Sequence, residues 1–341
     1  MIQEWDVIID WIGENSSSEY GRRSLHEQTV LSKEDARKEF RMINEAGSIR
    51  DSSTAGFNFR LDSVSSVYDI FENNEPLEAK HFRVIGDFLT SIRKAGEEIR
   101  KTKWYPHIES LFPAEFNISF EMTLKQSVTE KGEVSSNATP ELAKIRKTLS
   151  DTHRHIGDEI KKMILSPEYS SYLQEDWFTV RDDRYVLPFK SVHKRAMKGV
   201  IHNYSRTGRT AFLEPLPLID HNNRLSLLAS KELEEVIKVL RHLRGLLHRN
   251  SDYLKKCIEC GLHLENLDTK YKWMKKFKTV IPEFSDSGVN IKNGWYPPVF
   301  LTAGSGLVKN DFLFKEDDKI MVISGPNVGG KTVLRETVAT V

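Results

Sequence analysis

Apolar residues in the first 137 positions recur at the three-to-four spacing of amphipathic helices. A first helical face ends where Ser16–Ser18 interrupts it. A longer periodic stretch runs from Leu77 to about Lys101, whereas residues 47–66 are rich in Ser, Gly, Asp and Arg and predict a connection. We therefore expect a helical core over residues 1–137. The first face consists of Ile2, Trp5, Ile8, Ile9 and Ile12.

Two later stretches carry the heptad pattern of helices that pack side by side. Thr139 followed by Pro140 is typical of a helix start, with Thr as the N-cap and Pro in the first turn. The pattern predicts an outgoing lever helix over 138–174 and a returning helix, continuing into the core, over 216–278. A helix buried in an ordinary bundle is the alternative. The seams comprise Leu142, Ile145, Leu149, Thr152, Ile156 and Met163, and then Ala229, Leu233, Val236, Leu240, Leu243, Leu247, Asn250 and Leu254.

Residues 175–215, between the two seams, alternate β-branched or aromatic runs with turn residues. They predict strands at 176–180, 184–189 and 210–213. From Arg181 to Arg209 there are eight basic and two acidic residues, a local charge of +6. This charge is typical of a surface that contacts phosphate backbones without reading base sequence; a solvated basic face with no partner is the alternative. The basic residues are Arg181, Arg184, Lys190, Lys194, Arg195, Lys198, Arg206 and Arg209.

The last part of the chain, residues 279–341, has the pattern of a nucleotide-binding domain. Short apolar runs at 289–291, 298–301, 312–314 and 320–323 predict strands, the last leading into a glycine-rich loop. The loop fits G-x-x-x-x-G-K-[ST], in which backbone N–H groups and a lysine hold phosphates and a hydroxyl holds Mg²⁺. A structural glycine-rich turn is the alternative. The candidate ATP-binding residues are Gly325, Pro326, Asn327, Val328, Gly329, Gly330, Lys331, Thr332 and Val333, with Thr332 as the Mg²⁺ ligand.

Composition adds limits to this picture. With 341 residues, 39% of them hydrophobic and 29% charged, we expect two or three domains of a globular chain. Fifty Lys and Arg residues against forty-nine Asp and Glu give a net charge of +1, so only the local basic segment indicates nucleic-acid binding. Because the sequence has neither a membrane-length apolar stretch nor a signal-peptide pattern, we expect a cytoplasmic protein without a membrane partner.

The two cysteines, Cys257 and Cys260, form a CxxC pair. Two cysteines in so long a chain exclude a disulfide framework and fit a reducing compartment. A zinc or redox site would be expected to include a second ligand pair or a preceding thioredoxin-like strand. The simpler expectation is two helical thiols one turn apart, with zinc or redox chemistry as the alternative.

Several longer segments resemble the MutS family of DNA mismatch-repair ATPases, and above all its bacterial branch often called MutS-II. Residues 324–334 resemble the family segment T-G-P-N-x-G-G-K-T-V-x-L-K, in which Pro326 and Asn327 are more specific than a general P-loop. The other similar segments are 132–142 with G-E-V-x-D-x-A-S-P-E-L, 181–188 with R-D-G-R-Y-V-L-P, 212–216 with F-I-E-P-L and 222–223 with N-N.

The resemblance implies a mainly α fold with a β insert. It implies a helical core, long antiparallel lever helices, a small β clamp at 175–215 that closes over double-stranded or branched DNA, and the first β-rich part of an ABC-type ATPase domain. It further implies a nucleoid-associated protein of DNA repair or recombination control. In the family, two subunits form a homodimer through their ATPase domains, and ATP binding and hydrolysis drive clamp opening and closing.

The sequence departs from the family pattern in several places. Trp295 and Tyr296 replace the Arg and His of a G-R-H-P segment, so the contact to adenine is not predicted. The family's Walker B pair, signature loop and switch His would follow Val341, as would the Smr nuclease domain of the branch. We therefore expect a truncated ATPase that does not hydrolyse ATP alone. Phe314–Glu316 matches the letters of a Phe-x-Glu mismatch wedge but is expected to end a strand.

Two other functions are compatible with the sequence pattern. An SMC-like coiled-coil ABC ATPase tether would have much longer heptad stretches and a dimerising hinge. A non-enzymatic helical module that binds DNA or a protein partner would carry an inert P-loop. Because binding through phosphates weakens steeply with salt, a salt titration distinguishes DNA binding from binding to a protein partner.

Overall fold

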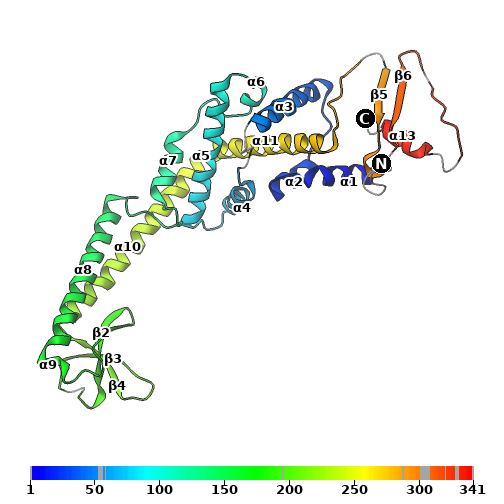
Figure 1. Ribbon diagram of the computed structural model, residues 1–341. Helices are drawn as coiled ribbons and strands as arrows, with labels where there is room; N and C mark the ends of the chain where they lie inside the picture. Colours follow the sequence, from blue (N-terminus) through cyan, green and yellow to red (C-terminus); the bar gives the residue numbers. More distant parts are fainter. Residues whose placement is uncertain are drawn as a thin grey trace. The chain divides into compact units, whose positions relative to one another are not determined.

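A computed structural model describes residues 2–52, 57, 59–193, 196–285, 288–299, 308–318, 320–326 and 330–339. The fold is mainly α-helical with a small antiparallel sheet, as predicted (Figure 1). The chain forms two compact units. The core unit contains residues 1–72, 88–116 and 252–341, and the lever unit contains residues 73–87 and 117–251. No helix in the described ranges is long and apolar enough to cross a membrane.

The central helix of the core unit is α11 (Ser251–Phe277). Its middle turns are buried on most sides, and Leu264 and Leu267 are fully buried. A Cβ added at Gly47 of α3 (Lys33–Ser52) would lie 2.2 Å from the ring of Tyr271, so only glycine allows α3 to approach α11 this closely. The other helices described in this unit are α1 (Ile2–Gly13), α2 (Glu19–His26), α4 (Leu61–Glu72), the second half of α5 (Ala79–Thr102), α6 (Pro106–Glu109) and α13 (Lys331–Ala339).

The connection predicted over residues 47–66 is wrong in extent, because α3 continues to Ser52 and α4 begins at Leu61. Ser, Asp and Gly have weak helix propensity, but tertiary packing overrides it here. Ala46 lies fully buried at the start of this segment, and Leu61 and Val64 lie fully buried at its end. Contacts with distant residues therefore allow both helices to extend into a segment whose local propensity is weak.

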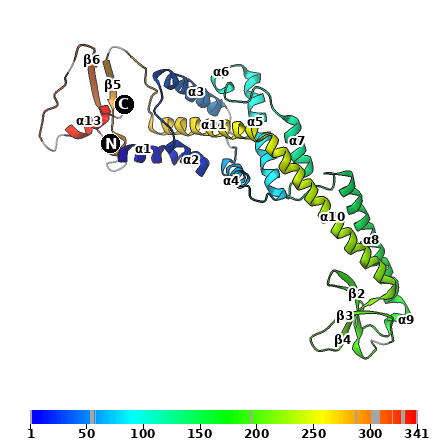
Figure 2. The same cartoon turned by 180° about the vertical axis from the view of Figure 1, so that it is seen from behind.

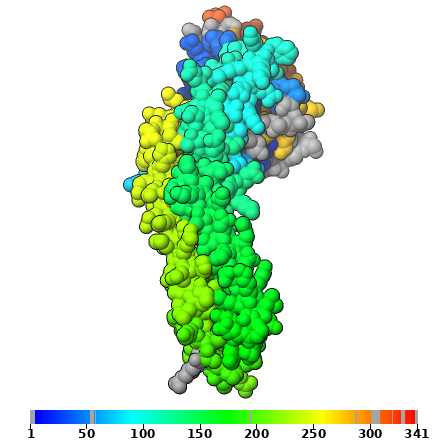
Figure 3. Space-filling model, turned by 90° about the vertical axis from the view of Figure 1, so that its left-hand side faces the viewer, coloured from blue at the N-terminus to red at the C-terminus, as the bar shows by residue number. Residues whose placement is uncertain are grey.

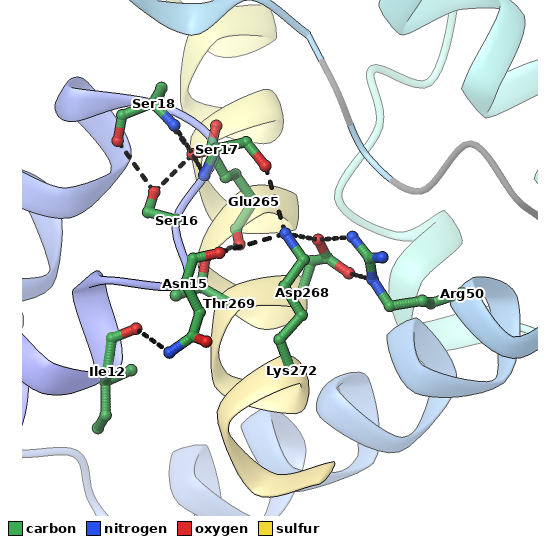
Figure 4. A network of polar contacts seen from close by, with 10 residues as sticks. All are labelled: Ile12, Asn15, Ser16, Ser17, Ser18, Arg50, Glu265, Asp268, Thr269 and Lys272. Atoms are coloured by element: carbon green, nitrogen blue, oxygen red, sulfur yellow. Dashed lines mark hydrogen bonds and ion pairs between the residues drawn. The ribbon is translucent and has the colours of Figure 1, made fainter. Parts of the chain in front are cut away.

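A buried carboxylate fastens the break between α1 and α2 to α11 (Figure 4). Oε1 of Glu265, a residue only 1% exposed, accepts hydrogen bonds from the hydroxyls of Ser16 (2.6 Å) and Ser18 (2.8 Å). It also accepts bonds from the backbone N–H groups of Ser17 (2.9 Å) and Ser18 (2.7 Å). Burying a carboxylate is costly unless donors surround it, so the serine turn both ends α1 and satisfies Glu265.

A second buried carboxylate, Asp268, lies on the same helix and binds cations instead (Figure 4). The Arg50 guanidinium donates to both carboxylate oxygens, with 2.5 Å between Nη2 and Oδ2. Nζ of Lys272 lies 3.0 Å from Oδ2 and also donates to the carbonyl of Asn15 at 3.2 Å. The two carboxylates therefore tie α3 and the α1–α2 turn to α11.

The lever unit is built on two long helices, α8 (Pro140–Leu165) and α10 (Leu216–Arg249), which run antiparallel and side by side (Figures 1, 2 and 3). The predicted start of α8 is confirmed: Oγ1 of Thr139 accepts a hydrogen bond from the backbone N–H of Leu142 at 3.1 Å, and Pro140 occupies the first turn. The shorter helices of the unit are the first turns of α5, α7 (Ile118–Ser127) and α9 (Pro167–Ser170).

The second predicted seam is only partly buried and is not one unbroken helix. Leu243 and Leu247 are fully buried, but Leu233 is 61% exposed. The helix ends at Asn250, whose backbone leaves the helical region and whose side-chain amide donates to the carbonyl of Leu246 at 2.8 Å. A local side-chain bond of this kind competes with helix continuation, which heptad spacing does not reveal.

A four-stranded antiparallel sheet joins the two lever helices, with strand order β1-β2-β4-β3. The turn between β1 and β2 is formed by Asp182 and Asp183, both at positive φ (48° and 60°), the backbone that a two-residue hairpin requires. The strands are β1 (Thr179–Arg181), β2 (Arg184–Lys190), β3 (Gly199–Tyr204) and β4 (Thr210–Pro215). The side chains between sheet and helices are Ile156, Ile160, Leu187, Phe189, Leu213, Leu218 and Leu225.

The sheet differs from its prediction at two strands. Residues 176–178 lie outside β1, which begins only at Thr179. β3 was not predicted, because its sequence Gly-Val-Ile-His-Asn-Tyr mixes polar and apolar residues without strict alternation. β3 is specified instead by pairing with β4 along its whole length.

The segment predicted to bind nucleotide contains an antiparallel pair, β5 (Gly288–Gly294) and β6 (Asn310–Lys315), and α13 (Lys331–Ala339). The predicted strands at 289–291 and 312–314 are confirmed, and Phe314–Glu316 contains the end of β6, as expected. Residues 297–299 are helical, so the strand predicted at 298–301 is wrong there. Residues 320–323 form no strand; Ile320 and Val322 are each 83% exposed, because the described residues supply no strand to pair with this run.

Candidate nucleic-acid interface and nucleotide loop

The basic residues of the sheet divide between its two ends. Arg181 and Arg184 pair across the β1–β2 hairpin, and Lys198 precedes β3 where its carbonyl accepts from Leu216 at the start of α10. We call this the α10 end. Lys190 pairs with Thr210 at the opposite end of β2, next to the β3–β4 turn. We call this the hairpin end, after the β3–β4 hairpin, and it carries Lys190, Arg206 and Arg209. Lys194 and Arg195 lie outside the described residues.

At the hairpin end, a hydrogen-bonded turn presents two arginines to solvent. Gly208 has φ 69°, and its N–H donates to the carbonyl of Ser205 at 2.8 Å. Ser191 begins the one-turn helix η1 (Ser191–His193). Its hydroxyl donates to the Gly208 carbonyl at 2.6 Å, and its backbone N–H donates to the Arg209 carbonyl at 2.9 Å. These bonds fix the backbone, while the side chains of Arg206 and Arg209 remain exposed.

At the α10 end, one buried carboxylate accepts hydrogen bonds from the polar side chains around it. Glu214 is 1% exposed and accepts from Arg184 Nη1 at 2.8 and 3.0 Å, and from Nε2 of His202 at 2.6 Å. Nδ2 of Asn222 donates to it at 2.7 Å. Burial by itself would raise the pKa of Glu214, but the hydrogen bonds from Asn222, His202 and Arg184 hold this pKa below its ordinary value.

Asn222 also links this carboxylate to the beginning of β2. Its side chain accepts from the backbone N–H of Tyr185 at 3.0 Å and donates to the Tyr185 carbonyl at 3.1 Å. Arg184 Nη2 donates to Oδ1 of Asn223 at 2.6 Å. The three segments around Arg184, Glu214 and Asn222 that carried the family resemblance therefore meet in one polar cluster.

A β-bulge places His202 in this cluster. Ile201 pairs with Leu213 and Asn203 pairs with Phe212, which leaves His202 as the extra residue of β3. A bulge of this kind re-aims a side chain, and here the imidazole reaches Glu214. The sequence pattern does not predict this cluster; the available signal was a glutamate inside the otherwise apolar run Phe212–Leu216, which burial would force to find a cation.

All three acidic residues within 179–215 lie at the α10 end: Asp182, Asp183 and Glu214. They match in number the basic residues Arg181, Arg184 and Lys198 of that end. Arg181 is also held at an aromatic face, with its guanidinium carbon 4.7 Å from the ring centroid of Phe212. Within 179–215, the positive charge that is not balanced is therefore at the hairpin end. Glu175 and Asp176 reduce this excess, because they follow Gln174, whose N–H donates to the Pro188 carbonyl at 2.8 Å.

The described parts of the glycine-rich loop are Ser324–Pro326 and Gly330–Val333; Asn327, Val328 and Gly329 lie outside them. Gly330 has φ 75° and immediately precedes α13, which begins at Lys331 as predicted. Nζ of Lys331 donates to the carbonyl of Gly325 and, at 3.1 Å, to that of Pro326. The lysine thus folds back over its own loop, and the helix begins behind it, an arrangement that fits a phosphate group.

Trp295 and Tyr296, which replace the family's Arg and His, pack inside the core unit. The Trp295 ring lies 6.3 Å from that of Trp11 and 6.5 Å from that of Phe277, between centroids. Tyr296 is 6% exposed. These aromatic residues serve to pack the end of β5 against α1 and α11, which accounts for their apolar character.

Cys257 and Cys260 are both buried in α11. Burial raises the pKa of Cys257 to about 12 and raises that of Cys260 further above its usual range. Among the described residues, no group of three or more His, Cys, Asp or Glu side chains is placed to hold a metal ion. The two thiols act as small apolar side chains of the helix core.

No family model matches the chain. It is 35% identical over 219 residues to a protein of Clostridium novyi (strain NT) named Endonuclease MutS2, covering 64% of this chain and 27% of that protein. A protein of the same name from Alkaliphilus oremlandii (strain OhILAs) is 29% identical over 354 residues, covering 98% of this chain and 43% of its own length. The similarities support the MutS family. The relatives are named MutS2, in place of the MutS-II branch expected above.

The MutS2 similarity includes both the basic sheet and the glycine-rich loop, because the Alkaliphilus alignment extends over nearly the whole chain. A further MutS2 protein, from Maridesulfovibrio salexigens, is 28% identical over 87% of this chain and 41% of its own length. The chain spans less than half the length of the curated relatives it matches.

Proposed function

We propose that this chain is part of a MutS2-like DNA-processing ATPase in which the sheet of the lever unit contacts DNA. The observation that carries the proposal is the concentration of unbalanced positive charge at the hairpin end of a sheet held on two long helices. In a chain whose net charge is only +1, a local charge of +6 between Arg181 and Arg209 indicates a polyanionic partner.

The proposed contact is to phosphates and not to base edges. Lys190, Arg206 and Arg209 would form it, together with Lys194 and Arg195. Exposed lysine and arginine side chains on turns hold a register on the backbone but carry little sequence information. Double-stranded or branched DNA is therefore the proposed partner, recognised through its charge and shape.

The glycine-rich loop is the proposed ATP site. Lys331 would exchange its bonds to the loop carbonyls for bonds to the β- and γ-phosphates, and Thr332 would offer its hydroxyl to Mg²⁺. Gly325–Val333 would supply the surrounding backbone. We further propose that the whole protein is a cytoplasmic, nucleoid-associated homodimer joined through its ATPase domains, in which ATP binding and hydrolysis open and close the clamp.

The SMC-like tether is less well supported by the observed lengths. α8 has 26 residues and α10 has 34, whereas a mechanical tether would need much longer paired helices. A non-enzymatic helical module that binds DNA or a protein partner and carries an inert P-loop remains distinguishable by experiment. The name of the relatives, Endonuclease MutS2, includes an endonuclease activity, which the proposal for this chain does not include.

A salt titration of DNA binding tests the proposal. Wild-type protein should bind a duplex of random sequence, and the logarithm of its affinity should fall linearly with the logarithm of salt concentration. Replacing Arg206 and Arg209 by Gln should reduce the salt slope by about two. The matched control neutralises two exposed basic residues of the core unit, Arg41 and Lys101. An affinity for duplex DNA that changes neither with salt concentration nor with the Arg206/Arg209 substitutions would favour a protein partner.

A further inference from the structure

We infer that Glu214, although negatively charged, is a positioning residue for DNA binding, and that its loss weakens binding to a polyanion. The inference rests on the proposed DNA-binding function and concerns how the basic surface is oriented. Simple charge counting leads to the opposite expectation, because removal of a carboxylate makes the sheet more positive and would strengthen binding to phosphates.

The geometry shows why Glu214 holds the sheet together. It lies on β4, the strand that pairs with both β2 and β3. Its carboxylate receives Arg184 from β2, His202 from β3 and Asn222 from α10, all within 3.0 Å. One buried side chain therefore fixes three structural elements relative to β4.

Arg184 is held away from a DNA-contact role by these bonds. Its Nη1 atom is within hydrogen-bond distance of both carboxylate oxygens, and its Nη2 atom donates to Asn223. The Arg184 side chain is only 25% exposed. A guanidinium committed in this way contributes little additional charge to a phosphate surface, and it acts as a bridge between β2 and α10.

His202 links Glu214 to the hairpin end. As the extra residue of the bulge, it sets the local bend of β3, and β3 leads directly into the turn that carries Arg206 and Arg209. When His202 loses its carboxylate partner, the bend of β3 is no longer fixed by the hydrogen bond to Glu214. The turn keeps its own backbone hydrogen bonds, but its direction relative to the α10 end is less well fixed, so ordering Arg206 and Arg209 on DNA becomes costlier.

The decisive test compares Glu214→Gln with wild type on the same duplex across salt concentrations. We expect affinity to fall about tenfold and the salt slope to decrease, despite the added positive charge. The matched control is Glu168→Gln on α9, which makes the same charge change at an exposed position and should not weaken binding. Unchanged or tighter binding by Glu214→Gln would overturn the inference.

A second variant keeps the test decisive where Glu214→Gln does not fold. Replacing Arg184 and Glu214 together by Met removes an ion pair without changing the net charge and leaves no unpaired charge of that pair. The positioning role predicts weaker DNA binding by a folded protein, as judged by circular dichroism. Wild-type affinity in this variant would refute the inference. Failure of wild-type protein to bind duplex DNA would instead refute the proposed function on which the inference rests.

Discussion

Two carboxylates, Glu265 in the core unit and Glu214 in the lever unit, are each only 1% exposed, yet their partners differ. Glu265 accepts from two serine hydroxyls and two backbone N–H groups, so its bonds come from neutral donors. Glu214 accepts from an arginine, a histidine and an asparagine. Neutral donors fix a turn that lies next to the carboxylate in space, whereas Arg184 and His202 reach Glu214 from two separate strands.

The difference assigns the two residues different tasks. The serine turn around Glu265 uses backbone groups that have no other role, so this site is expected to act in stability alone. Glu214 instead controls side chains that charge counting would assign to DNA. Buried carboxylates are thus informative about function only when their partners are known.

The largest expected effect comes from Glu265→Ala. This change leaves the donors of Ser16–Ser18 unsatisfied and opens a cavity, and it should lower the free energy of unfolding of the core unit by about 4 kcal/mol. Urea unfolding followed by tryptophan fluorescence measures it, because five of the six tryptophans belong to this unit. Exposed Glu259 on the same helix supplies the control, and its change to Ala should cost less than about 0.5 kcal/mol.

Arg184→Met should have the next largest effect, destabilising the sheet of the lever unit by about 3 kcal/mol, because it leaves Glu214 buried without its arginine partner. Hydrogen exchange at the amides of Leu187 and Leu213 reports the loss. Adding Glu214→Met should recover at least about 1 kcal/mol, since neither charge is then left unpaired. Equal costs for the single and double variants would contradict the pairing. Arg154→Met, at a side chain 71% exposed, is the control.

A third carboxylate, Glu39, tests how pH acts on a cation-paired site in the core unit. Burial alone would raise its pKa, but His263 and Lys270, at 2.9 and 2.8 Å, lower it to about 2 from 4.5. Because the folded pKa lies below the ordinary value, its stabilisation is present above pH 4.5 and is lost as the pH falls toward 2. Between pH 5 and pH 3 the core unit should lose about 2 kcal/mol from this residue.

The measurement for Glu39 is the urea midpoint at each pH. Glu39→Gln should remove this part of the pH dependence, whereas Glu34→Gln, at an exposed position on the same helix, should leave it intact. Parallel curves for wild type and Glu39→Gln would show that the pairing does not contribute.

The smallest expected effects distinguish side-chain from backbone donors around Glu265. Ser18 donates through both its hydroxyl and its N–H, so Ser18→Ala should cost about 1.5 kcal/mol. Ser17 donates to Glu265 through its N–H only, so Ser17→Ala should change stability by less than about 0.5 kcal/mol. Equal losses from the two changes, measured by urea unfolding, would show that the hydroxyl of Ser18 is not the important donor.

The parts of the fold that sequence predicts correctly depend on local signals. The start of α8 at Thr139 and Pro140 follows from capping, and the start of α13 at Lys331 follows from the glycine-rich loop. Both signals act within a few residues of the chain. The existence of the long lever helices also follows from their periodicity, although not the break at Asn250.

The parts that sequence does not predict depend on distant partners. Arg184 and Glu214 are 30 positions apart, so a pattern that counts basic residues assigns Arg184 to DNA although the fold pairs it with a buried acid. β3 lacks strict alternation of polar and apolar residues and is specified by pairing with β4. Ile320–Ile323 shows the converse, because a strongly apolar run forms no strand where the described part of the chain supplies no neighbouring strand.

The uneven charge of the sheet also has a kinetic consequence. The end that contains Asp182 and Asp183 is electrically balanced, whereas the end that contains Arg206 and Arg209 is positive. The centre of charge is therefore displaced along the strands, which gives the sheet an electric dipole about its middle. A long polyanion approaching this dipole experiences a torque before any contact forms, so it arrives with one preferred end of the sheet facing it. At low ionic strength this raises the fraction of encounters that are productive. At about 0.1 M salt, screening confines the effect to separations below about 10 Å.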